Sequence, residues 1–249
     1  MPTSGTSVFG MSARSGTGAD ATVTGGQTDD AVLVKNRGSA VASLFSSRLT
    51  STGYLVTSAG DAEVAAGTTI LQANPWDVMD GVKVGTTSTI TNASGSTFVN
   101  YLFKRAPSFM DVVCYTGNGN ANITINHNLR VVPELMIVKR RNGLGGWIVY
   151  VSTLGASQSL TLQTTNPAST TSIWDNTSPT SSVFTLGSGS AVNASAGTYI
   201  AYLFATCAGV SKVGSYTGTG ALQTVNCGFT FRGQGFVLIK RTDSTGDWY

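Results

Sequence analysis

Short apolar or alternating runs, separated by clusters of Gly, Ser, Thr and Asn, dominate this chain. No segment of a dozen residues keeps a helical period, and turn signals such as Asn142-Gly143 stand between the runs. Runs rich in β-branched and aromatic residues predict strands at 112–116, 122–126, 134–140, 147–152, 159–163, 182–186 and 198–206. So many short strands in about 100 residues predict an all-β fold of β-sandwich, jelly-roll-like domains.

The pattern repeats with a period near 101 residues. Matching pairs are Tyr115-Thr-Gly-Asn-Gly119 with Tyr216-Thr-Gly-Thr-Gly220, Tyr101-Leu-Phe103 with Tyr202-Leu-Phe204, and Trp147 with Trp248; Gly16-Thr-Gly18 marks an earlier copy. This period fits a small domain better than a solenoid unit. We therefore expect copy one at 1–107, copy two at 108–209 and a partial copy three at 210–249.

Copy three is too short to bury both faces of a sheet. Strands are expected in it at 213–217, 224–227 and 236–241. Three strands with one open apolar face are marginal alone and invite aggregation. We expect this segment to be completed by another part of an assembly or by further chain, and we favour a homo-oligomer, most simply a trimer.

Charged residues make up only 11% of the chain, against about 25% in ordinary proteins. A surface of neutral polar residues is typical of extracellular or virion β-proteins. The net charge of +3 gives no reason to expect nucleic acid, and the apolar runs are too short to span a membrane. Cys114, Cys207 and Cys227 have no metal-ligand or disulfide spacing, so we expect buried thiols.

Few residues suggest chemistry. His127 is the only histidine and lies at a strand-to-loop transition, where a turn role is favoured over catalysis or metal binding. Asp77 and Asp175 follow Trp76 and Trp174 at equivalent places, which favours loop structuring over an acid–base pair. We expect no enzymatic activity, no cofactor and no metal.

Basic residues cluster where the apolar runs of 32–35, 136–139 and 237–240 end. Lysines there are candidates for contact with a polyanion or an anionic glycan. We favour the alternative that they cover apolar surface and protect strand edges. The candidate residues are Lys35, Lys139, Lys240, Arg140, Arg141 and Arg241. The recurring aromatic residues are expected to form a shared core rather than stack on sugars.

Several segments together carry a family resemblance. They are Tyr115–Gly119, His127-Asn-Leu129, Pro133–Arg141, Trp147-Ile-Val-Tyr150, Pro179–Gly187, Tyr199–Phe204 and Lys240–Tyr249. The chain resembles a family of large repeat-bearing virion proteins of tailed bacteriophages, often from aquatic and cyanobacterial hosts. Arg130 and Gly146 stand where that family usually has Gly and Asp, so the local turn geometry there is the feature to check.

The resemblance implies a non-enzymatic virion structural protein, most simply a tail fibre or tail appendage involved in assembly or host attachment. Its partners would be other virion proteins and a host cell-surface glycan. A capsid decoration or head-fibre protein and a glycan-binding adhesin are the alternatives. A polysaccharide depolymerase ranks last, because a catalytic pair needs two different roles and the equivalent places of Asp77 and Asp175 favour loop structuring.

Overall fold

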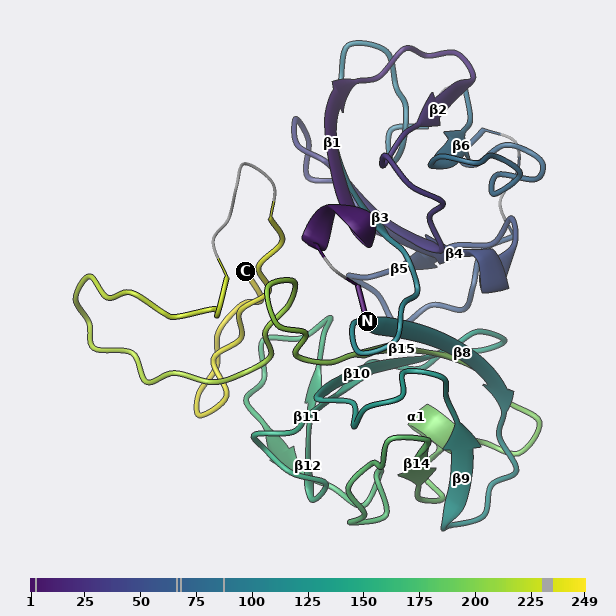
Figure 1. Cartoon of the computed structure of the whole chain (residues 1–249). Coiled ribbons are helices and arrows are strands. Elements are labelled where there is room, and N and C mark those ends of the chain that lie inside the picture. Colours follow the sequence, from purple (N-terminus) through teal and green to yellow (C-terminus); the bar gives the residue numbers. More distant parts are fainter. Residues whose placement is uncertain (3, 66, 68, 87, 230–234) are drawn as a thin grey trace.

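The computed structural model describes residues 1–249 except 3, 66, 68, 87 and 230–234. The described chain is nearly all β-structure, which confirms the predicted fold class. Two large antiparallel sheets lie one above the other in Figure 1, and a two-stranded sheet accompanies each. Helix within the described residues is limited to the 3-10 turns η1 (Gly5–Ser7) and η2 (Arg48–Thr50) and the short α1 (Ser190–Asn193).

The first large sheet has the strand order β1-β7-β3-β4-β5. Strands β2 and β6 pair separately. The bounds are β1 Phe9–Ser15, β2 Ala21–Val23, β3 Ala31–Asn36, β4 Leu44–Ser47, β5 Leu55–Val56, β6 Val82–Val84 and β7 Thr97–Phe103.

The second large sheet has the order β13-β12-β11-β10-β15-β8, and β9 pairs with β14. The bounds are β8 Met110–Thr116, β9 Ile123–Asn126, β10 Leu135–Arg140, β11 Trp147–Val151, β12 Gln158–Thr161, β13 Ser169–Thr170, β14 Val183–Leu186 and β15 Thr198–Phe204. All seven strands predicted here are present. The sequence did not predict β13, because its two residues are polar and exposed.

Strands related by the sequence period occupy matching places in the two sheets. In the first sheet β7 lies between β1 and β3; in the second, β15 lies between β8 and β10. The pairs β2–β6 and β9–β14 also correspond. The division into domains at 107 and 209 stays a prediction, since a shared strand order does not itself locate a domain boundary.

Three apolar clusters explain why the strands read as almost continuous hydrophobic runs. One cluster contains residues of both large sheets, including Phe45, Ile137 and Tyr202. A second contains Met136 and Val138 with residues of β14 and α1, and a third joins β2 and β6 to the first sheet. Because successive strand residues face opposite sides, β10 needs apolar residues on both faces.

The predictions for copy three are wrong in one respect. Residues 213–217, 224–227 and 236–241 form no strand in the described structure. Backbone pairing within residues 236–249 consists of the bridge between Lys240 and Trp248 and the two hydrogen bonds between Ile239 and Tyr249. The physical reason is that a strand needs a neighbour to pair with. In the second sheet β15 lies between β8 and β10 and pairs with both, and residues 210–249 contain no counterpart of β15.

Candidate functional site

The β10–β11 hairpin presents two side chains toward copy one. Lys139 and Trp147 are directly paired across the hairpin, so they share one face of the sheet. That face also carries Ile137 and Val149, which belong to the cluster shared by the two large sheets. Both Lys139 and Trp147 are fully buried. The hairpin thus meets the loop that follows β5; we call this contact of 139–147 with 56–63 the first junction.

Trp147 anchors the first junction. Its indole Nε1–H donates to the carbonyl oxygens of Val56 at 2.9 Å and Ala59 at 3.2 Å. Its ring stacks with Phe45, at 6.2 Å between centroids, and Phe45 stacks on Tyr202 at 4.0 Å. One side chain therefore satisfies loop carbonyls of copy one and joins an aromatic stack between the copies.

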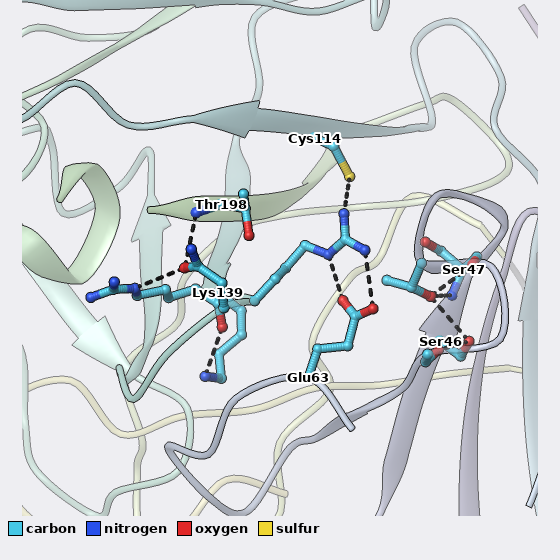
Figure 2. A network of polar contacts seen from close by, with 11 residues as sticks. Ser46, Ser47, Glu63, Cys114, Lys139 and Thr198 are labelled. Carbon is cyan, nitrogen blue, oxygen red and sulfur yellow. Dashed lines mark hydrogen bonds and ion pairs between the residues drawn. The ribbon is translucent and has the colours of Figure 1, made fainter. Parts of the chain in front are cut away.

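Lys139 makes the second anchor with its ammonium group. Nζ donates to the carbonyl oxygens of Gly60 at 3.1 Å and Arg140 at 3.0 Å, and the Gly145 N–H also donates to Gly60. Figure 2 labels Lys139 in a network of polar contacts that also contains Glu63 and Thr198. Burial lowers the pKa of Lys139 to about 8, against the opposing attraction of Asp61. A buried, partly desolvated lysine is held here by carbonyl dipoles rather than by a direct ion pair.

An ion pair closes the edge of the first junction. Arg141 Nε and Nη2 donate to the Glu63 carboxylate at 2.5 and 3.0 Å, a two-pronged contact drawn in Figure 2. The Glu63 N–H also donates to the Arg141 carbonyl at 2.8 Å. The third guanidinium nitrogen, Nη1, lies 3.6 Å from the Cys114 sulfur. The hydrogen bonds with Glu63 raise the pKa of Arg141.

The same contacts recur between copy three and copy two, and we call this contact of 240–248 with 161–168 the second junction. Trp248 Nε1–H donates to the Thr161 carbonyl at 3.2 Å. Lys240 Nζ donates to the Thr165 carbonyl at 3.0 Å, and the Gly246 N–H donates to the same oxygen at 2.9 Å. The Ala168 N–H donates to the Thr242 carbonyl at 2.9 Å. Donor and acceptor thus keep the arrangement of the first junction.

Copy one carries a variant of this hairpin. Val34 pairs with Leu44 as Val138 pairs with Ile148, so Ser43 takes the place of the junction tryptophan. Lys35 Nζ donates within its own hairpin, to the Val41 carbonyl at 2.6 Å. The hairpin of copy one therefore lacks the aromatic anchor that the other two use.

The structure brings most of the basic candidates to the junctions. Lys139, Arg141 and Lys240 have the partners described above, and Arg241 makes an exposed ion pair with Asp243 at 2.8 Å. Arg140 Nε donates to Asn142 Oδ1 at 3.2 Å. Contact of these residues with a polyanion or glycan stays a prediction. Sequence reasoning missed the loops 56–63 and 161–168, because a carbonyl acceptor leaves no signature in residue type, and it missed Glu63 because its partner Arg141 lies 78 residues away.

His127, the tryptophans beside Asp77 and Asp175, and the cysteines lie in structural settings. His127 Nδ1 accepts the Leu129 N–H at 3.3 Å, while Nε2 lies 3.2 Å from the Thr180 carbonyl; burial lowers the pKa of His127. Trp76 and Trp174 are both buried. The expectation of buried thiols is wrong for Cys114, which is exposed at the sheet edge beside Arg141, while Cys207 is buried.

Copy one holds one perturbed carboxyl. Asp29 is fully buried, and burial raises its pKa to about 6. Its Oδ1 accepts a hydrogen bond from Gln27 Nε2 at 2.9 Å. Nearby, Asp80 Oδ1 accepts three successive backbone N–H groups, from residues 25–27, which fixes that loop. This pair of acidic residues shapes a turn.

The described residues hold neither a metal-binding cluster nor a membrane-spanning helix. No three His, Cys, Asp or Glu side chains gather closely enough there to hold a metal ion. In the same residues, no helix has the length and apolar character needed to cross a membrane.

Comparison with known proteins identifies a family for the second and third copies. Residues 106–249, more than half of the chain, match a family model described as a domain of unknown function, DUF7483. No curated protein and no solved structure matched the chain.

Proposed function

Since the chain belongs to the DUF7483 family, whose description assigns no activity, we propose from its own structure that it is a non-enzymatic structural protein that builds a linear array of β-domains. The observation that carries the proposal is the recurrence of one junction geometry at two successive places. A contact that uses different surfaces on its two sides is heterologous, and such a contact builds an open array unless the rotation between successive units closes a ring.

Within this proposal, the array forms part of a phage virion, most simply a tail fibre or tail appendage for assembly or host attachment. Supporting this is the low share of charged residues, which suits a particle surface. The titratable groups of the junctions also serve docking: Lys139 binds carbonyls and Arg141 binds Glu63. Further contacts would be made with other virion proteins and with copies of the same chain.

Labelling tests the location. An antibody against residues 108–209, detected with gold on intact phage particles, should mark the tail appendage. Label on the capsid would instead support the decoration or head-fibre alternative and overturn the tail assignment. Loss of host polysaccharide on incubation with purified protein, abolished by one Asp or Glu substitution, would overturn the non-enzymatic assignment.

Added repeats test the array. We would insert one or two extra copies of residues 108–209 after residue 209. The maximum dimension of the protein, measured by X-ray scattering, should then grow by the same amount with each added copy. If the radius of gyration instead grew with the number of copies as it does for a flexible chain, the junction would not be repeated between the added copies.

A further inference from the structure

The repeated Gly-x-Gly segment docks onto a specific turn in both complete copies. In copy two, the Gly119 N–H donates to the Asn193 carbonyl at 2.9 Å, and the Gly117 N–H donates to the Gly197 carbonyl at 2.7 Å. A Cβ at Gly117 would overlap the Ala194 carbonyl oxygen. Gly18 and Gly16 make the corresponding contacts with residues 92–96 in copy one. Glycine is needed here because two backbones approach closely.

A buried asparagine organises each docked turn. Asn193 Oδ1 accepts the Asn118 N–H at 2.9 Å, and its Nδ2 donates to the carbonyls of Asn120 at 2.6 Å and Gly187 at 3.0 Å. Asn92 repeats this with Thr17, Ala19 and Gly85 in copy one. The strand that follows each asparagine, β15 or β7, then enters the middle of the large sheet.

The docked element has a shared sequence in the two copies. Residues 92–103 read Asn-Ala-Ser-Gly-Ser-Thr-Phe-Val-Asn-Tyr-Leu-Phe, and residues 193–204 read Asn-Ala-Ser-Ala-Gly-Thr-Tyr-Ile-Ala-Tyr-Leu-Phe. Asn-Ala-Ser, Thr and Tyr-Leu-Phe are common to both. Residues 210–249 contain no such element.

Copy three carries the receiving half in a preformed state. Gly220 has φ +72°, close to +78° at Gly119 and +69° at Gly18. Thr219 Oγ1 donates to the Ala221 carbonyl at 3.2 Å, as Thr17 Oγ1 does to Ala19 in copy one. The local turn therefore forms without its partner.

In copies one and two the docked turn covers the Gly-x-Gly segment. In copy three the same surface is uncovered. Gly218 and Gly220 have no atom within 4 Å of an added Cβ. In the described part of the chain, residues 214–228 make no backbone–backbone hydrogen bond. Tyr216 is 51% exposed, whereas Tyr115 stacks on Tyr199 at 5.1 Å and donates to the Val192 carbonyl.

We propose that residues 213–220 bind a strand–turn element of the Asn-Ala-Ser-x-x-Thr…Tyr-Leu-Phe type, supplied by a polypeptide segment outside residues 1–249. The added strand would pair through its backbone, as in other strand additions, and its asparagine would hold the Thr-Gly-x-Gly turn. A second copy of this chain is a poor source, because its own β7 and β15 already lie in the middle of its sheets. The inference is independent of the location on a virion.

A fluorescent peptide of residues 190–205 tests the proposal by anisotropy against the full 249-residue chain. We expect saturable binding, weakened at least tenfold by Gly218→Val, because a side chain there would overlap the incoming turn. Gly218→Val leaves the free chain unchanged since its surroundings are open. Gly214→Ala, where the nearest atom is the Lys212 side chain at 3.8 Å, is the matched control and should bind normally.

A peptide with Asn193→Ala should also bind at least tenfold more weakly. Equal affinity of wild type and Gly218→Val, or no saturable binding at millimolar peptide, would overturn the proposal. Dimers of the chain without peptide, lost in Gly218→Val, would show that a second copy supplies the strand and would overturn the choice of partner.

Discussion

The two junctions share a set of backbone contacts but differ in what surrounds them. In both, a lysine and a tryptophan of one hairpin donate to carbonyls of the preceding copy's loop. At the first junction these side chains are fully buried and the Arg141–Glu63 pair closes the edge. At the second, Trp248 and Lys240 are partly exposed, and Thr242 and Ala168 replace the ion pair. The carbonyl contacts thus define the docking geometry, while burial and charge set its strength.

Replacing each tryptophan in turn should give the largest difference in stability between the two junctions. We expect Trp147→Ala to lower the free energy of unfolding by about 3–5 kcal/mol, the usual cost for a buried tryptophan. Trp248→Ala should cost about 1–2 kcal/mol, because its ring is partly exposed. Urea unfolding measures both, with exposed Tyr216→Ala as the control. Equal losses at Trp147 and Trp248 would contradict the ranking of the junctions.

The pH dependence of stability should identify the buried lysine of the first junction. The pKa of Lys139 is about 8 in the folded chain and 10.5 when unfolded, so between these values the unfolded chain binds more protons. Stability should therefore rise with pH across this window, by about 2 kcal/mol from pH 7.5 to 10, relative to Lys139→Met. Parallel pH profiles of wild type and Lys139→Met would contradict the assignment.

The ion pair is the next difference between the junctions. We expect Glu63→Gln to destabilise the chain by about 1 kcal/mol, because Arg141 loses a two-pronged charged partner at a half-buried edge. Exposed Asp243→Asn, which removes the Arg241 pair beside the second junction, should have no measurable effect. A thermal shift for Asp243→Asn as large as that for Glu63→Gln would show that burial does not decide the strength.

Arg130, which lies outside both junctions, provides a reference for how much a single backbone conformation changes the stability. Arg130 is exposed and has φ +64°, a left-handed conformation that costs a non-glycine residue about 1 kcal/mol. Arg130→Gly should therefore stabilise the chain by up to about 1 kcal/mol, despite the greater freedom of glycine when unfolded. Calorimetry checks the sign, and a lower melting temperature would contradict it. This is the position where the resembling family usually has Gly.

The amino-acid sequence determined the strands of copy two and the all-β class. Runs such as 134–140 and 198–206 bury both faces in the sheets, so their apolar pattern was strong enough to predict them. The period of 101 residues also identified Trp147 and Trp248 as equivalent, and the structure gives them the same kind of partner. Local residue choice and local pairing were sufficient for these features.

Only the tertiary structure decided what the strand-end lysines and the Gly-x-Gly turns contact. At the two junctions and in the docked turns the partners include backbone carbonyls of segments tens of residues away, such as Gly60 for Lys139, and every residue type carries a carbonyl. The same limit explains why copy three was expected to form strands. The sequence of 213–217 resembles β8, but a strand forms only where another strand completes its hydrogen bonds.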